Sequence, residues 1–420
     1  MIGHESGKKN YHYGFLIFAC VFIWTITTGS KNVFTAEIVE LTRIFDATKD
    51  QLSLAMTYYF ITYSTLQIIL YFIMPKINIK WYLLITMALS GLVTIIIAFS
   101  TGLYAFWWIL SINGILQAGI WGMCIGTLKK YLPDFLVPKA LTCMSIGTAI
   151  AGVISYGSAS IAVAINFWNL PYIVLGSILF ISAFIYFFAV KLCDKNKEEP
   201  KIVDPNIPTK NTQKNILPLN NKFARVIFLV VSFIISIGVH FIFYGTQNWI
   251  PSLLAEVYGK SSSFGILVSV LAPLATTLGP IISVKHTEKA KNYLFVLMTY
   301  SIIFALLSLL LVFLFDKGLI VALIILLLYL LTIHASVTII TSITSFKLGS
   351  LINSGAYSSL MNAGGGFSAG FAPMLLALVI DGLGWKAYYK LVCIITLSIT
   401  AIISFSVLFV YFYNKKRKLN

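Results

Sequence analysis

Long apolar segments follow one another along almost the whole chain, and charged or turn-forming residues separate them. Their length matches the roughly 20 residues that an α-helix needs to cross the hydrocarbon core of a bilayer. The pattern therefore predicts an all-α membrane protein with twelve transmembrane helices. The predicted spans cover residues 13–36, 51–74, 81–99, 103–128, 140–164, 167–190, 223–254, 262–284, 292–315, 318–345, 354–380 and 386–413.

The composition agrees with this pattern. Of the 420 residues, 59% are hydrophobic and 10% are charged, whereas an ordinary soluble domain has about 25% charged residues. This excludes a simple soluble enzyme. The five cysteines lie in or beside apolar segments without a CxxC pair, which predicts packing residues, no metal site and no cofactor. The first span lacks a small-residue cleavage site and precedes eleven others, so we expect a helix rather than a signal peptide.

The net charge of +16 is distributed unevenly between the predicted loops. The two termini and the loops on their side carry 23 of the 30 basic residues, the opposite loops carry 5, and Lys31 and Lys390 lie inside helices. The positive-inside rule then places both termini in the cytoplasm of a cell-membrane protein. The charge is therefore explained by topology, and we expect no nucleic-acid partner.

One long polar segment interrupts the pattern in the middle of the chain. Residues 191–222 contain several charges and prolines and read as a cytoplasmic linker. They divide the chain into an N-terminal six-helix half, residues 1–190, and a C-terminal six-helix half, residues 223–420.

The two halves share an internal repeat. Gly29, Asn32 and Glu40 at the end of the first span recur 216 positions later as Gly245, Asn248 and Glu256. The fifth and eleventh spans align at the same offset, and one residue of slippage aligns Gln117 of the fourth span with His334 of the tenth. Three helix pairs with a nearly constant offset indicate a duplicated six-helix unit.

Two parallel six-helix repeats joined by a linker resemble the major facilitator superfamily of transporters. The resemblance implies that the first, second, fourth and fifth helices of each half line a central cavity, and that the others face lipid. It also implies that the halves rock to expose the cavity alternately. We expect a monomer in the lipid bilayer that binds a small-molecule substrate.

Three short motifs are similar to the organophosphate:phosphate antiporter branch of that superfamily. They are Lys31-Asn32 with Phe34, Tyr244-Gly245 with Trp249 and Pro251, and the turn 381–385. In that branch an arginine precedes each of the first two motifs and binds the phosphate. Here those positions are Ser30 and Phe243, so the resemblance implies the fold but not the phosphate substrate.

Lys31 is the basic residue that lies deepest in the first eleven spans. It either extends to the outer interface or faces the cavity and attracts an anionic substrate, and the aligned basic residue of the resembled branch favours the cavity. All 14 acidic residues fall in loops or near helix ends, which argues against proton coupling by a membrane carboxylate. Glu37, Glu40 and Glu256 are expected to be solvated or to have a structural role at helix ends, with gating or proton relay as the alternative.

Two histidines are candidates for coupling a proton to transport, because imidazole titrates near neutral pH. They are His240 in the seventh span and His334 in the tenth, and a packed structural histidine is the alternative for each. The repeat partner of His334 is the polar Gln117, which makes His334 the stronger candidate for the substrate site.

Aromatic and amide side chains complete the predicted substrate site. Aromatic walls with a few hydrogen-bonding groups suit a small organic solute better than a metal ion. The aromatic candidates are Tyr59, Tyr63, Trp121, Tyr244 and Tyr357, and the polar candidates are Asn32, Gln67, Gln117, Gln247, Asn248 and Asn362.

These observations predict a secondary active transporter of a small organic anion, preferably a carboxylate, with Lys31 as its anchor. The alternatives are efflux of amphipathic or cationic compounds through the aromatic cavity, and a non-transporting sensor built on a transporter fold. An enzyme is not expected, because the chain contains no nucleophile–base pair, metal cluster or phosphate-binding loop.

Overall fold

The computed structural model describes residues 2–47, 49–133, 135–195, 222–260, 268, 271–348 and 352–419, and these residues form helices and short turns without a strand. The N-terminal half contains α1 (Ile2–Ile44), α2 (Lys49–Ile73), the 3₁₀ turn η1 (Met74–Lys76), α3 (Ile79–Ile97), α4 (Leu103–Gln117), α5 (Ile120–Tyr131), α6 (Val137–Ala164) and α7 (Leu170–Lys195). The C-terminal half contains α8 (Lys222–Gln247), α9 (Ile250–Glu256), α11 (Leu271–Lys289), α12 (Tyr293–Leu314), α13 (Leu319–Thr338), the π-helix η2 (Ile339–Ile343), α14 (Thr344–Lys347) and α15 (Ser354–Leu419).

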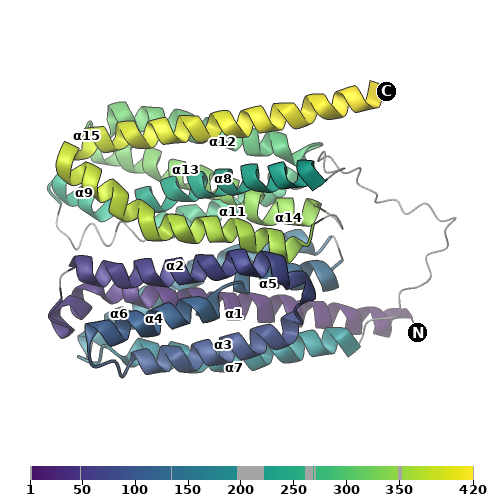
Figure 1. The fold of residues 1–420 in the computed structure, drawn as a ribbon, viewed down its shortest axis with the longest axis horizontal. Helices are drawn as coiled ribbons and strands as arrows, with labels where there is room; N and C mark the ends of the chain where they lie inside the picture. The colour runs from purple at the N-terminus through teal and green to yellow at the C-terminus, as the bar shows by residue number, and fades with distance from the viewer. Residues whose placement is uncertain are drawn as a thin grey trace.

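The long helices run side by side, and both termini lie at the same end of the molecule (Figure 1). We call this end the terminal face and the other end the opposite face. Nine helical segments of the described residues are long and apolar enough to cross a membrane. One of them, α15, bends at Gly384 and contains two spans. With α2 and α11 in the second and eighth positions, the chain has the twelve spans that the sequence predicts.

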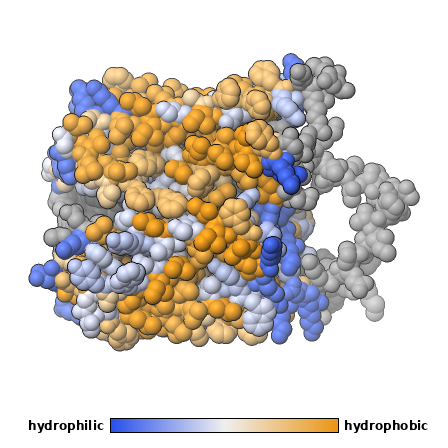
Figure 2. Space-filling model, in the orientation of Figure 1, coloured by the Kyte–Doolittle hydropathy of each residue, from blue (hydrophilic) through white to orange (hydrophobic). Residues whose placement is uncertain are grey.

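The outer surface is suited to lipid rather than water. Hydrophobic residues cover most of the face shown in Figure 2, and hydrophilic residues gather toward the two ends. Large apolar side chains such as Trp108 and Phe405 are more than two-thirds exposed. A soluble protein rarely exposes so large an apolar area, whereas a bilayer is itself an apolar solvent.

Corresponding helices pack alike in the two halves. In the N-terminal half α1 packs on α6 and α2 on α4, and in the C-terminal half α8 packs on α15 and α11 on α13. A glycine of the repeat lies in each of the first contacts of the two halves. A Cβ at Gly29 would lie 3.6 Å from the carbonyl oxygen of Ala151 on α6, and one at Gly245 would lie 2.3 Å from Leu376 Cδ1 on α15. Two six-helix repeats are therefore present in the fold.

The halves meet through α2 and α5 against α15, and through α6 against α11. Near the terminal face the contact is between glycines: a Cβ at Gly355 would lie 2.7 Å from the carbonyl oxygen of Gly122. Because neither residue has a side chain, the backbones of α5 and α15 approach closely there.

Two predicted spans are interrupted in the structure. The fourth span, 103–128, divides into α4 and α5, because Ala118 is extended and Gly119 has a φ of 81°. The seventh span, 223–254, divides into α8 and α9 after Gln247. The predicted linker at 191–222 falls mostly on residues 196–221, which lie outside the described residues, so the half boundaries remain predictions.

Candidate functional site

A chain of polar side chains crosses the middle of the N-terminal half. The Tyr59 hydroxyl donates to Gln117 Oε1 at 2.6 Å, and Gln117 Nε2 lies 3.1 Å from Ser90 Oγ and 3.4 Å from Ser30 Oγ. Ser90 in turn donates to Asn113 Oδ1 at 2.6 Å. Gln117 ends α4, directly before the break at Gly119. The network thus fixes Tyr59 and Gln117 at mid-membrane depth and satisfies both groups of the Gln117 amide.

Histidines occupy the equivalent positions of the C-terminal half. His334, which aligns with Gln117, has its Nδ1 2.6 Å from the carbonyl oxygen of Thr276, and Thr276 aligns with Tyr59 at the same offset of 217. His240 lies 216 positions after Trp24 and has its Nδ1 2.8 Å from the carbonyl oxygen of Ser236. Since a carbonyl only accepts, both Nδ1 atoms carry hydrogen, and each neutral ring keeps Nε2 as an acceptor.

Close packing holds these histidines in place. A Cβ at Gly365 would lie 2.8 Å from the His240 ring, so glycine is needed where α15 passes α8. Phe243 stacks on His334 at 5.0 Å between ring centroids, and Tyr244 stacks on His240 at 6.2 Å. The two histidines therefore belong to one aromatic group on α8 and α13.

A hydrogen bond between the halves lies at the centre of the molecule. Asn362 of α15 donates from Nδ2 to the Tyr63 hydroxyl of α2 at 3.0 Å, and Tyr63 stacks on Tyr59 at 5.8 Å. One turn further along α2, the Gln67 side chain is fully buried beside the Tyr63 hydroxyl, and its amide atoms make no hydrogen bond of ordinary geometry with the described residues. This amide leaves a donor and an acceptor for another molecule.

Lys31 lies on α1 and reaches inward. Its Nζ lies 5.6 Å from the centroid of the Phe60 ring, which packs edge-on against Tyr59 and Tyr63. The residue is half-buried, and within the described part of the chain no carboxylate lies within 4.0 Å of its ammonium. Lys31 is thus directed toward the aromatic group of α2.

The other predicted residues are more scattered. Trp121 packs on Trp24 at 4.6 Å, which places it beside the central helices, while Tyr357 stacks on Phe228 at 5.9 Å, closer to the terminal face. Asn32 and Gln247 are half-buried, and Asn248 is exposed beyond the end of α8. The structure therefore links Tyr59, Tyr63, Gln117 and Asn362 by hydrogen bonds and a ring contact, with Gln67 one turn away on α2. It places His334 in the aromatic group of α8 and α13 and leaves Asn248 outside both groups.

Glu37 contradicts the expectation of a solvated side chain. It is only 1% exposed, and its carboxylate lies beside the buried Tyr172 hydroxyl of α7 without a hydrogen bond of ordinary geometry to the described residues. The other two glutamates have partners: Glu40 pairs with Arg43, and Glu256 accepts from Trp385 Nε1 at 2.9 Å. The sequence signal was ambiguous, because Glu37 comes near the end of an apolar span where burial depends on how α7 packs.

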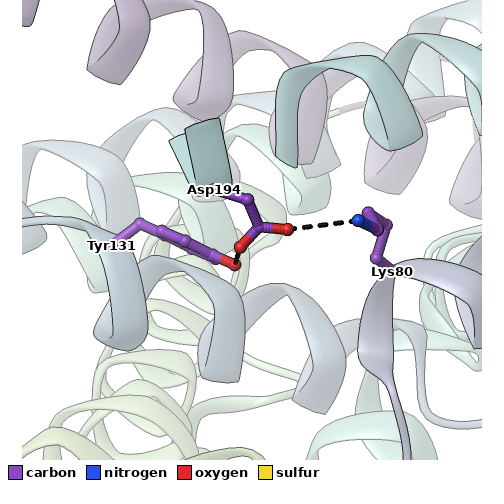
Figure 3. Close-up of polar contacts among 3 residues, drawn as sticks. All are labelled: Lys80, Tyr131 and Asp194. Carbon is purple, nitrogen blue, oxygen red and sulfur yellow. Dashed lines mark hydrogen bonds and ion pairs between the residues drawn. The ribbon is translucent and has the colours of Figure 1, made fainter. Parts of the chain in front are cut away.

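A polar cluster near the terminal face was also missed by the sequence reasoning. Lys80 of α3 lies 3.2 Å from Asp194 of α7, and the Tyr131 hydroxyl of α5 donates to the other carboxylate oxygen (Figure 3). Lys80 Nζ also lies over the Phe187 ring at 5.5 Å. The cluster joins three helices of one half, and no sequence motif links its members.

The cysteines behave mainly as packing residues. Cys20, Cys124, Cys193 and Cys393 are buried free thiols, while Cys143 is exposed. In the residues that the structure describes, no three histidine, cysteine or acidic side chains are placed to hold a metal ion.

Comparisons with known proteins agree on one fold. The family model described as "Major Facilitator Superfamily" matches residues 14–352. The crystal structure of the transporter FucP in the outward conformation has a TM-score of 0.65 and 16% identity, over 94% of this chain and 98% of that chain. The proton:xylose symporter XylE, bound to 6-bromo-6-deoxy-D-glucose, has a TM-score of 0.73 and 12% identity, over 95% of this chain and 96% of that one. No curated protein sequence matches the chain.

Proposed function

Because the chain belongs to the Major Facilitator Superfamily, we propose that it is a secondary active transporter that moves a small organic anion, preferably a carboxylate, by alternating access. The observation that carries this proposal is Lys31, whose ammonium is directed to the aromatic group around Phe60 and has no carboxylate within 4.0 Å among the described residues. A half-buried cation without a counter-charge is costly in a membrane, and an anionic substrate would provide the missing charge.

The neighbouring groups are suited to the rest of such a solute. The buried Gln67 amide has unused donor and acceptor atoms, and Asn362 and Tyr63 already form one hydrogen bond that a substrate could replace. The stacked Tyr59 and Tyr63 rings offer an apolar surface between them and Phe60. A carboxylate with a small organic body would use both kinds of group.

The central histidines support coupling to protons. Each uses Nδ1 for a backbone carbonyl and keeps Nε2 for a proton. Protonation would add positive charge to the same central region as an anionic substrate, so we propose His334 and His240 as the coupling residues. An anion and a proton would then enter together.

The proposed orientation follows from the basic residues, of which 23 lie on the side of the termini and 5 on the other. We propose that the terminal face is cytoplasmic in the cell membrane. The halves, residues 1–190 and 223–420, would rock about the central site, and the glycine contact between α5 and α15 would open and close the cytoplasmic side.

A thermal-shift screen with transport assays tests the proposal. Purified protein is screened against carboxylates, phosphate esters, sugars and cationic amphiphiles, and Lys31→Ala is compared with Lys317→Ala, an exposed lysine of the opposite face. We expect one carboxylate class to stabilise the wild type and Lys317→Ala. Lys31→Ala should bind it more weakly by about 2 kcal/mol or more. Equal binding by Lys31→Ala would refute the anion site.

The same screen separates the alternatives. Efflux of amphipathic cations is favoured by the aromatic rings of α2, and it predicts stabilisation by cationic amphiphiles that Lys31→Ala does not reduce. A non-transporting sensor predicts binding without flux in proteoliposomes.

A further inference from the structure

A cavity lies in the C-terminal half, away from the central polar residues. It is a space of about 520 Å³ between α8 and the last part of α15, with α12 behind it. Ile227 and Val231 of α8, and Ile403 and Val407 of α15, form its walls, and Leu297 lines it from α12. None of the hydrogen-bonded central residues around Gln117 and His334 lines it. Its lining is almost entirely apolar, so it is suited to a hydrocarbon chain.

The cavity has the depth of one leaflet of a bilayer. Its lining residues on α8 run from Phe223 near the terminal face to Ile235, a length of about 18 Å at about 1.5 Å per residue. Half of a bilayer core is about 15 Å thick. The cavity also opens sideways, because Ile227 on its wall is 46% exposed and Phe405 is 74% exposed on the membrane surface.

The rim of the cavity is positively charged. Lys222 and Arg225 stand at the start of α8, and Lys415 stands near the end of α15, so all three lie at the terminal face beside the cavity. The aromatic residues Phe223 and Tyr413 line the same end. Basic and aromatic side chains at a membrane interface favour an anionic lipid headgroup.

We propose that this cavity binds an acyl chain of an anionic glycerophospholipid, with the phosphate held near Lys222, Arg225 and Lys415. The apolar walls match the chain, the depth matches a single leaflet, and the charged rim matches the headgroup. The inner wall of the site includes Tyr357, which follows Gly355 by two residues on α15. A bound lipid therefore contacts the helix segment through which the halves meet at the terminal face.

Two variants with neighbouring substitutions test the cavity. Ile227→Trp fills it, whereas Val226→Trp is the matched control, because Val226 is 56% exposed on the same helix and does not line the cavity. The probes are phosphatidylglycerol and phosphatidylcholine with identical acyl chains, added to the detergent-purified full chain. Melting temperature gives the half-saturating lipid concentration, and native mass spectrometry counts the retained lipid.

We expect phosphatidylglycerol, more than phosphatidylcholine, to stabilise the wild type and Val226→Trp. Ile227→Trp should lose the bound lipid. Replacing Lys222, Arg225 or Lys415 with Gln should raise the half-saturating phosphatidylglycerol concentration by about fivefold for each residue. If Ile227→Trp does not fold, Ser406→Trp fills the cavity from α15 and serves the same purpose. Equal stabilisation of the wild type by both lipids would overturn the proposal. So would lipid retention by Ile227→Trp or Ser406→Trp equal to that of the wild type.

Discussion

At the scale of single residues, the two halves place different chemistry at equivalent positions. Trp24 and Gln117 of the N-terminal half correspond to His240 and His334 of the C-terminal half. Trp24 donates from Nε1 to Thr148 at 2.9 Å, whereas His240 needs the room left by Gly365. At these two positions of the repeat, the N-terminal half has side chains that do not titrate near neutral pH, and the C-terminal half has imidazoles. This division favours proton binding in the C-terminal half.

The first residue-scale prediction concerns His334. In His334→Asn the side-chain amide can still donate to the Thr276 carbonyl, but it cannot take up a proton. If the histidine couples a proton to anion entry, wild-type uptake rises as the pH falls, and the variant loses this rise. We expect a difference of about tenfold in half-saturating substrate concentration at acid pH. Uptake in proteoliposomes across a pH series checks it, with exposed His286 replaced by Asn as the control. An unchanged pH profile in His334→Asn would rule out coupling at this residue.

The second prediction concerns Glu37, whose buried carboxylate has only the Tyr172 hydroxyl beside it. Glu37→Met removes the carboxylate, whose burial costs more than that of the hydroxyl left behind, and keeps a side chain of similar length. We expect the free energy of unfolding to rise by about 1–3 kcal/mol. Glu40→Met is the matched control, and because Glu40 pairs with Arg43 near the surface, we expect little change. The melting temperatures of both variants and the wild type are measured in detergent. A melting temperature of Glu37→Met below that of the wild type would contradict the argument.

At the scale of elements, the break between α4 and α5 determines where the central polar network ends. Gly119 has a φ of 81°, and a Cβ there would lie 2.4 Å from Leu70 Cδ1 of α2. A left-handed backbone and a close neighbour both require glycine. The break leaves Gln117 as the last residue of α4, beside Tyr59 and Ser90. Interrupted helices of this kind are typical of transporter sites at mid-membrane depth.

The element-scale prediction follows from this break. Gly119→Ala should lower the free energy of unfolding by about 1–3 kcal/mol, because alanine disfavours the left-handed conformation and its methyl group meets Leu70. Gly102→Ala is the control, since a Cβ at Gly102 meets no atom within 4 Å. Thermal unfolding in detergent measures both variants. A melting temperature of Gly119→Ala equal to that of the wild type would mean that the break tolerates a side chain.

The elements also show how far sequence reasoning reaches. Twelve spans could be predicted because the bilayer fixes their length, and the repeat could be predicted because Gly29 and Gly245 occupy the same crossing in both halves. Of the candidate site, His334 and Gln117 could be found through that alignment. The break at Gly119 could not, because its φ depends on contact with Leu70. The burial of Glu37 and the Lys80–Asp194 pair depend likewise on helices that are distant in sequence.

At the scale of the whole molecule, the contacts within the N-terminal half differ in kind from the contacts between the halves. Within the N-terminal half, Asp194 joins α7 to Lys80 of α3 and to Tyr131 of α5. Between the halves at the terminal face, α5 and α15 meet through Gly122, Gly126 and Gly355. The first arrangement favours movement of the half as one body. In the second, the side chains that pack on the glycines are few, with Ser359 against Gly122 and Met74 against Gly355, so the two helices can separate with little loss of packing.

The whole-molecule prediction is a reversible lock. A Cβ at Gly126 would lie 3.5 Å from the Cα of Gly355, so cysteines at both positions can form a disulfide once α5 and α15 move apart to relieve the 2.7 Å approach of a Gly355 Cβ to the Gly122 carbonyl oxygen. In Gly126→Cys combined with Gly355→Cys, we expect oxidation to stop uptake and reductant to restore it. The single variants are controls, and mass spectrometry of peptides prepared with and without reductant reports the cross-link. Uptake by the cross-linked protein would contradict alternating access through this contact.

The glycine contact has a consequence for the equilibrium between conformations. Contacting glycines remove little apolar area, so this part of the interface contributes little free energy to the closed arrangement. Conformations that differ by only a few kcal/mol coexist in measurable populations, and a ligand shifts them by no more than its difference in affinity. A substrate at the centre, or a lipid beside Tyr357, therefore needs only a modest preference to change which side of the membrane the protein faces most of the time.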